Sequence, residues 1–224
     1  MLTAMAVKSV ARRFGADVVG ISPVSRFANA PVRMSPQGHL PTARSVVVSA
    51  IHIPDTCLEL GREPVPHNWG TGHAGGLTNA LLEQLAFRLA KFIEREGYRC
   101  VPIPQTAIWR YQPHKELDNY LTPDLSHIHA AAAAGLGEIG YHGLLLTPEY
   151  GDRIRLVTVI TEAELDPDPL YTGPALCDRC MLCVKHCTPS DGLRKEVHGL
   201  TRVDIGGRIF EYANKNKLRC AWAE

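Results

Sequence analysis

The sequence predicts an α+β fold in which helices and strands mix without a strict repeat. Residues 45–53 form a β-branched run bounded by prolines, which is typical of a central strand buried on both faces. Residues 154–161 predict a further strand, and residues 77–96 place leucines at helical spacing. We therefore expect a layered α+β domain that ends near residue 165.

Spacing and stop residues predict the other elements in chain order: a helix over residues 3–14, a short strand over 16–21, a long loop over 22–41, an irregular stretch over 61–76, an edge strand over 98–103, an alanine-rich helix over 124–134 and a linker over 166–174. Pro102 cannot donate to a strand ladder, which favours an edge position. The helix over residues 77–96 is expected to bury one stripe, formed by Leu77, Leu81, Leu85, Leu89 and Phe92. The loops over 22–41 and 61–76 are candidate site loops.

Composition and charge exclude several classes of protein. Of 224 residues, 45% are hydrophobic and 21% are charged, which is ordinary globular usage. The net charge of +1 supplies no field that would draw the chain onto nucleic acid or an anionic membrane, so it argues against both partners. The apolar stretches fall short of the ~20 residues of a spanning helix. The N-terminus lacks the pattern of a secretory signal, so we expect a cytoplasmic protein.

Four of the seven cysteines are packed into residues 177–187. Cys177, Cys180, Cys183 and Cys187 follow the spacing C-x2-C-x2-C-x3-C, which wraps a 4Fe-4S cluster in bacterial-type ferredoxins. A zinc site is the alternative, but zinc knuckles pair one C-x2-C with a distant pair, so the spacing favours iron. Two isolated cysteines, Cys57 and Cys100, are expected to be small core or loop residues.

The number of cysteines limits the number of clusters. In this run the fourth cysteine usually ligates a different cluster from the first three. Cys187 would then need companions, and only Cys220 follows it in the sequence. The spacing therefore predicts one cluster, and a second only if the natural chain continues past residue 224.

A glycine block at residues 134–140 contains G-x-G-x-x-G, with Gly135, Gly137 and Gly140 as its glycines. The block follows a predicted helix instead of a strand, so the context of a dinucleotide-binding turn is missing. What remains is a helix stop followed by a tight turn, which allows a close backbone approach to something large.

Polar residues begin the helix before this block. Asp124 is a candidate N-cap, with Ser126 close by. His127 and His129 are two residues apart and point to different helix faces, which argues against a joint metal site. His52, His67, His73 and the patch over residues 111–114 stay unassigned.

Several segments together resemble one family. Residues 40–48 are similar to the entry to its central strand, and the glycine block followed by residues 143–151 is similar to its most recognisable segment. The cysteine run after the next strand is in the family's position. On these residues the chain resembles the cobalamin-dependent iron–sulfur reductases, which include epoxyqueuosine reductase and the reductive dehalogenases.

The resemblance implies a nitroreductase-like, layered domain over residues 1–165 that holds a base-off corrinoid, cobalamin, and a ferredoxin-like 4Fe-4S module over residues 174–224, truncated if the natural chain is longer. Electrons would pass from the clusters to cobalt, and low-valent cobalt would reduce an organic substrate. Cys220 matches a ligand of the second cluster together with Cys187. We also expect a small-molecule substrate and a reduced ferredoxin or flavodoxin-type electron donor.

The corrinoid is expected to bind over the glycine block, in contact with Ser126, His127, Gly135, Leu136, Gly137, Gly140, His142, Gly143 and Leu144. His127, His129 or His142 could coordinate cobalt, but we expect no such bond, because cobalt without a strong lower ligand is easier to reduce. Asp124 and Tyr141 are equal candidates for the proton donor. The sequence of residues 141–143 is closer to the dehalogenase-like branch, so the substrate does not carry over from the tRNA-modifying branch.

Two other functions stay open. The chain could be an iron–sulfur electron-transfer or corrinoid-reducing accessory protein without its own organic substrate. It could also be a zinc-stabilised binding module. A visible spectrum distinguishes these, because iron–sulfur absorbs broadly near 400 nm, corrinoid adds sharp bands and zinc is silent.

Overall fold

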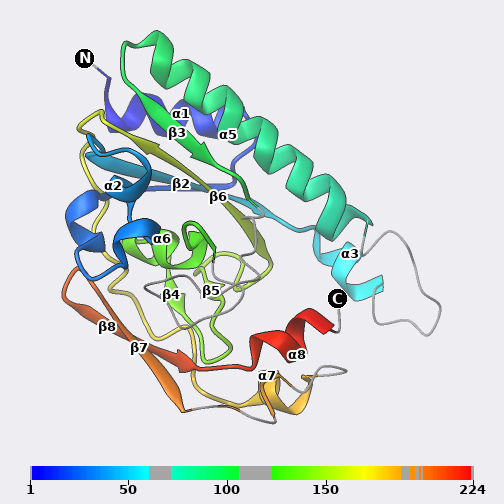
Figure 1. Cartoon of the computed structure of the whole chain (residues 1–224). Coiled ribbons are helices and arrows are strands. Elements are labelled where there is room, and N and C mark those ends of the chain that lie inside the picture. The colour runs from blue at the N-terminus through cyan, green and yellow to red at the C-terminus, as the bar shows by residue number, and fades with distance from the viewer. Residues whose placement is uncertain are drawn as a thin grey trace.

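A computed structural model describes residues 2–60, 72–105, 123–187, 192–194, 197 and 199–222. Its centre is a four-stranded antiparallel sheet in the order β1-β2-β6-β3 (Figure 1). The strands are β1 (Val18–Pro23), β2 (Ser45–His52), β3 (Cys100–Ile103) and β6 (Ile154–Thr161). The predicted central strand is therefore confirmed as β2, and the predicted edge strand as β3.

Helices cover both faces of this sheet. Helices α1 (Ala4–Arg13) and α5 (Thr78–Arg95) lie on one face, and α6 (His127–Ala133) lies on the other (Figure 1). Strand β2 is buried on both faces, since Val47 packs with α1 and α5, whereas Val46 and Val48 pack with α6. The α+β class that the sequence predicts is confirmed.

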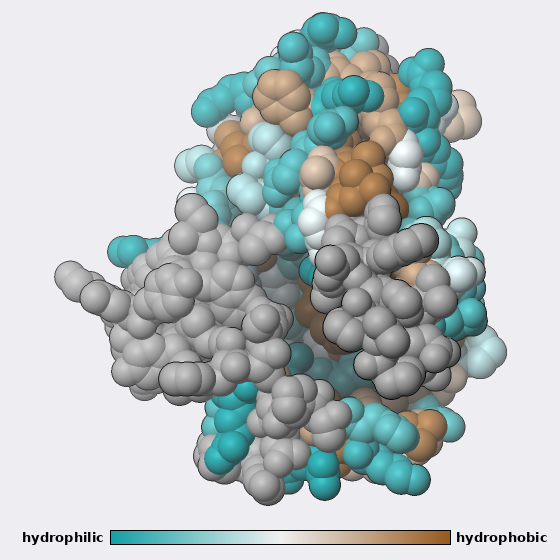
Figure 2. All heavy atoms as spheres, turned by 90° about the vertical axis from the view of Figure 1, so that its right-hand side faces the viewer, coloured by the Kyte–Doolittle hydropathy of each residue, from teal (hydrophilic) through white to brown (hydrophobic). Residues whose placement is uncertain are grey.

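The buried stripe of α5 differs from the predicted one. Leu85 and Leu89 are fully buried, as expected, but Leu77 and Leu81 are 50% and 44% exposed. The buried stripe is shifted by one position along the chain, and its other members are Thr78, Leu82, Ala86, Ala90 and Ile93. Figure 2 shows hydrophobic surface on the side of the molecule where α5 begins, in keeping with the exposed leucines.

Two loop predictions are refined by the structure. The predicted loop over residues 22–41 contains three short helical turns: η1 (Val24–Phe27), η2 (Val32–Met34) and α2 (Pro36–His39). Of the second loop, residues 61–71, with His67, lie outside the described residues, as do residues 111–114. The rest forms a π-helical turn, η3 (Gly72–Leu77), that leads into α5, and α3 (Asp55–Leu60) follows β2.

The second half of the chain adds two hairpins and two short helices. The elements are β4 (Glu138–Ile139) with β5 (Leu145–Leu146), α7 (Leu182–Lys185), β7 (Leu200–Ile205) with β8 (Arg208–Ala213), and α8 (Lys217–Trp222). Ile205 and Phe210 join the core on the α6 side of the sheet, so the β7–β8 hairpin packs there. Residues 166–174 carry no helix or strand. The division near residues 165 and 174, and the ferredoxin-like character of the second unit, stay predictions.

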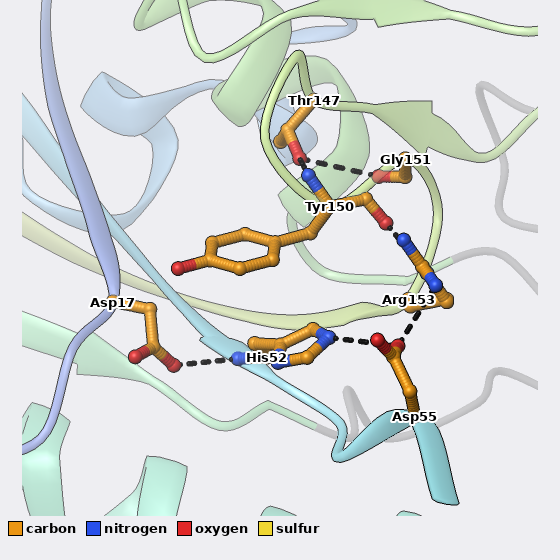
Figure 3. Close-up of polar contacts among 7 residues, drawn as sticks. All are labelled: Asp17, His52, Asp55, Thr147, Tyr150, Gly151 and Arg153. Carbon is orange, nitrogen blue, oxygen red and sulfur yellow. Dashed lines mark hydrogen bonds and ion pairs between the residues drawn. The ribbon is translucent and has the colours of Figure 1, made fainter.

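A cluster of polar contacts fixes the end of β2 (Figure 3). The ring of His52 stacks on Tyr150 with a centroid distance of 4.4 Å. Arg153 donates to the carbonyl of Tyr150 at 3.1 Å and pairs with Asp55 at 2.8 Å. The tight turn over residues 147–151 thereby attaches to the sheet, which gives His52, unassigned in the sequence, a structural role.

Candidate functional site

The cysteine segment has an unusual backbone conformation on both sides of Cys180. Arg179 and Met181, on either side of this residue, both have positive φ, at 56° and 60°. This conformation is uncommon for residues other than glycine. Burial raises the pKa of the Cys183 thiol, and Cys177 and Cys180 are near enough to raise it further. Within the described ranges, no three His, Cys, Asp or Glu side chains already have the geometry of a metal site.

Cys187 and Cys220 lie beside the same short segment of chain. The N–H of Leu193 donates to the Sγ of Cys187 at 3.4 Å. A Cβ placed on Gly192 would lie 2.6 Å from the Sγ of Cys220. The structure therefore brings together the two cysteines that the family resemblance assigns to one cluster.

A carboxylate that sequence reasoning missed anchors the first cysteine. Oε1 of Glu138 accepts the N–H groups of Leu176 and Cys177, at 2.5 Å and 2.8 Å. Its Oε2 pairs with Arg208 at 3.1 Å. In the same turn, the N–H of Tyr141 donates to the Sγ of Cys177 at 3.4 Å. Glu138 lies inside the glycine block, but nothing in the motif indicates that its side chain reaches the cysteine segment.

The structure corrects the interpretation of the glycine block. A Cβ on Gly135 would lie 2.0 Å from the carbonyl oxygen of Pro169, and φ there is +75°. A Cβ on Gly137 would lie 1.8 Å from the carbonyl oxygen of Leu146. The close approach that glycine allows at these two positions is made by the chain's own backbone, and an external ligand is not needed to explain it. Leu136, between them, is buried in the hydrophobic core.

A cavity of about 700 Å³ lies between the α6 side of the sheet and the β7–β8 hairpin. Its wall includes four of the residues predicted for cofactor or metal binding, namely Ser126, Gly143, Leu144 and Cys220. The other predicted corrinoid contacts are not part of this wall: His127, Gly135, Leu136, Gly137, Gly140 and His142. The cavity therefore lies beside the turn that follows the glycine block, at Gly143 and Leu144.

Ser126, and not Asp124, begins α6. Its Oγ accepts the N–H of His129, which is the N-cap contact, and the helix runs from residue 127. Asp124 precedes the helix, and its carbonyl oxygen is 3.0 Å from Nε2 of His39. Asp124 and Tyr141, the two predicted proton donors, are not among the residues that line the cavity.

The two histidines of α6 face different partners, as predicted. The ring nitrogens of His127 contact Thr158 Oγ1 at 2.7 Å and the carbonyl of Pro104 at 2.8 Å. Those of His129 contact Ser126 Oγ at 2.5 Å and the hydroxyl of Tyr212 at 2.8 Å. Tyr212 and His129 both line the cavity, so a phenol–imidazole pair faces it. No sequence signal pointed to Tyr212, which a hairpin brings back from far along the chain.

His142 is also held within the chain. Its Nδ1 accepts the N–H of Leu144 at 3.0 Å, and its Nε2 lies 3.5 Å from Oδ2 of Asp152. This hydrogen bond from His142 lowers the pKa of Asp152. The ring covers Gly140, where an added Cβ would meet His142 Cε1 at 2.9 Å.

The neutral state of His129 makes the fold sensitive to acid. Burial, with a smaller contribution from the charge of Lys217, lowers the pKa of His129 to about 4. The unfolded chain takes up this proton near pH 6.5, so the free energy of unfolding is expected to fall between about pH 6.5 and 4, by up to about 3 kcal/mol. Burial also lowers the pKa of His127, so this residue contributes to the same decrease in the free energy of unfolding as the pH falls.

Urea unfolding at a series of pH values measures this effect. His129→Gln is expected to flatten the profile between pH 6.5 and 4, and His52→Gln, outside the cavity, is expected to leave it as steep as in the parent protein. An equally steep profile in His129→Gln would contradict the prediction.

Comparisons with known proteins support the family resemblance. The chain is 30% identical over 123 residues to a tetrachloroethene reductive dehalogenase of Dehalobacter restrictus, covering 54% of this chain and 19% of that protein. It is 43% identical over 66 residues to an epoxyqueuosine reductase of Listeria monocytogenes, covering 30% of this chain and 17% of that protein. The matched part thus spans less than a fifth of each relative. No family model matches the chain.

Solved structures share the fold. An epoxyqueuosine reductase bound to a tRNA-Tyr stem loop matches with a TM-score of 0.57 and 19% identity, over 84% of this chain and 52% of that one. A catabolic reductive dehalogenase in complex with 3-bromo-4-hydroxybenzoic acid matches with a TM-score of 0.66 and 20% identity, over 96% of this chain and 28% of that one. The predicted relation to both kinds of reductase is confirmed.

These comparisons correct one expectation. The near-zero net charge was taken to argue against nucleic acid, but a protein of this fold is solved with a tRNA stem loop. Net charge reports the sum over the surface and not its local distribution, so it does not exclude such a partner. Across the part of the chain that the structure describes, no helix has the length and apolar character needed to cross a membrane.

Proposed function

We propose that this chain is the corrinoid-binding, iron–sulfur part of a reductase that cleaves a small organic substrate reductively. One observation carries the proposal: Cys220 is part of the wall of the 700 Å³ cavity. A cysteine of the expected cluster set therefore borders the space in which a corrinoid would lie. Both kinds of relative are reductases, which supports an oxidoreductase.

The cysteines fit an iron–sulfur centre. Cys177, Cys180 and Cys183 would hold one 4Fe-4S cluster, and Cys187 with Cys220 would serve a second. N–H groups point at the sulfurs of Cys177 and Cys187, an arrangement that stabilises thiolate charge and tunes the potential of such clusters. When bound, the clusters supply one-electron transfer and the corrinoid supplies cobalt-based reduction.

The cavity wall suits a large, mostly apolar ligand. Phe27, Leu125 and Ile128 contribute apolar surface that keeps water out. On the same wall, burial raises the pKa of Tyr212, so its phenol keeps its proton at neutral pH beside His129. A proton donor must come within about 3 Å of the reacting atom, and Tyr212 therefore joins Asp124 and Tyr141 as a candidate.

An electron donor would approach the cysteine segment from outside. Cys180 is exposed, and next to it the side chains of Met181 and Leu182 are 39% and 55% exposed. This apolar surface beside a cluster ligand supports docking of a reduced ferredoxin or flavodoxin-type donor.

The test is corrinoid binding to the anaerobically purified protein. Wild-type protein is expected to bind cobalamin, with a change in its absorption spectrum. Ala30 lines the cavity, so Ala30→Trp fills part of it and is expected to weaken binding at least tenfold. Ala28, exposed in the same segment and not part of the wall, gives the matched control Ala28→Trp, which should bind as the wild type does.

Circular dichroism checks that both variants are folded. Absence of cobalamin binding by the wild type, or equal binding by both variants, would show that the cavity is not the corrinoid site.

A further inference from the structure

The charges around the cavity are unbalanced. Among the residues that the structure describes, four cationic side chains contribute to its wall, Arg26, Arg202, Lys215 and Lys217, against one carboxylate, Asp204. The carboxylate is engaged elsewhere, since its Oδ1 accepts the N–H of Gly207 at 2.8 Å in the β7–β8 turn.

The two arginines already have partners within the chain. Arg202 pairs with Glu211, with Nε at 2.9 Å from Oε1. Arg26 donates to the carbonyl oxygens of Ala133 and Asp168 at 2.6 Å and 2.8 Å. Both guanidinium groups are therefore already paired within the chain and do not call for a bound anion.

The two lysines are different. Lys215 donates to one carbonyl, that of His142, at 3.2 Å. Lys217 makes no hydrogen bond or ion pair with any residue that the structure describes, although it is half-buried. Burial lowers the pKa of Lys217, and the ammonium group of Lys215 lowers it further. Both lysines lie in one cavity wall, partly out of water, and neither has a carboxylate partner in the described part of the chain. Two such cations are unfavourable until an anion joins them.

The neighbours of the lysines suit such an anion. Burial, with a smaller contribution from Lys217, lowers the pKa of His129 to about 4, so the ring is neutral near pH 7 and adds no third positive charge beside the lysines. The hydroxyl of Tyr212, which contacts His129, and the backbone at Gly143 lie beside the lysines. A Cβ placed on Gly143 would lie 3.3 Å from the Tyr212 ring and 3.9 Å from Nζ of Lys215, so these groups border one small space.

We propose that Lys215 and Lys217 form a subsite for an oxyanion, so that the ligand of this cavity carries a phosphate or carboxylate group at the β8–α8 end. Charge-assisted hydrogen bonds from ammonium to oxyanion are among the stronger ones in proteins, and partial burial strengthens them. The proposal refines the function above by naming a chemical feature of the ligand. The oxyanion can come from a phosphodiester of the corrinoid or from the substrate.

Inorganic phosphate is the first probe, titrated calorimetrically into the full chain purified without oxygen. We expect Lys217→Gln to weaken phosphate binding at least tenfold and Lys217→Arg to restore it, since the charge returns. Lys91→Gln, on the exposed face of α5 and outside the cavity wall, should bind as the wild type does. Phosphate should also raise the melting temperature of the wild type and not that of Lys217→Gln.

Two corrinoids then identify the source. Cobinamide lacks the phosphodiester of cobalamin. If Lys217→Gln loses affinity for cobalamin but not for cobinamide, the oxyanion belongs to the corrinoid. Unchanged affinity for both, with phosphate binding lost, assigns it to the substrate. Failure of both corrinoids to bind the wild type would refute the proposed function and leave the phosphate result intact. Absence of phosphate binding by the wild type, or equal binding by Lys217→Gln, would overturn the subsite.

Discussion

Cys180→Ser is expected to lose nearly all iron and sulfide and the broad absorption near 400 nm. Cys180 lies between two residues with positive φ, and its N–H donates to Asp178 Oδ1 at 3.0 Å. A serine hydroxyl is a poor ligand for iron, and Cys177 and Cys183, the two thiolates left of the three assigned to this cluster, cannot hold a cubane. Metal content and the visible spectrum of protein purified without oxygen measure the loss.

The same variant should weaken the local fold. Metal binding and local folding are linked, because the unfolded segment offers no assembled site. Limited proteolysis is therefore expected to cut residues 177–187 faster in Cys180→Ser than in the wild type. Cys57→Ser, in α3, is the matched control and should keep its iron. Full iron and sulfide in Cys180→Ser would remove the cluster assignment, and zinc in the wild type would favour a zinc-stabilised module.

Gly137→Ala is expected to destabilise the protein by about 3 kcal/mol or to prevent folding. The added Cβ would lie 1.8 Å from the carbonyl oxygen of Leu146 and 2.8 Å from its carbonyl carbon, and both are backbone atoms of β5. The β4–β5 pairing, in which Glu138 opposes Leu146, would have to open. Urea unfolding followed by circular dichroism gives the change in the free energy of unfolding.

A second glycine provides the control. Gly75 lies in the helical turn before α5, with no positive φ and nothing within 4 Å of an added Cβ. Gly75→Ala should leave stability unchanged or raise it slightly, because alanine loses less backbone entropy in a helix. If Gly137→Ala proves as stable as Gly75→Ala, the close backbone packing at Gly137 does not constrain the fold.

Patterns that depend on local chemistry could be read from the sequence. The β-branched run at β2 places apolar side chains on both faces of the sheet. Such a run is typical of a strand that is covered by helices on both sides. The cysteine spacing likewise predicts a cluster from local chemistry, and that assignment stays a prediction. The α5 stripe was wrong by part of a turn, because leucines occupy both the buried face and the neighbouring exposed face, and spacing alone does not select between them.

The site depended on contacts that no local pattern encodes. The spacing of the glycine block is the same whether a ligand or the chain's own backbone fills the space above it, and only the position of Pro169 and Leu146 decides. Tyr212 and Lys217 reach the cavity because the β7–β8 hairpin returns to α6. The cap was misjudged for a related reason: Asp124 and Ser126 are both good N-cap residues, and the local backbone selects Ser126.

The Glu138 carboxylate joins the cysteine segment to the β7–β8 hairpin. It holds the first residues of the cysteine segment with one oxygen and Arg208 of β8 with the other. The β7–β8 hairpin forms a wall of the cavity. If the cysteine segment becomes disordered, Glu138 loses one of the two contacts through which it joins this segment to the hairpin. Ordering of the cysteine segment and positioning of this wall of the cavity are therefore coupled through one carboxylate.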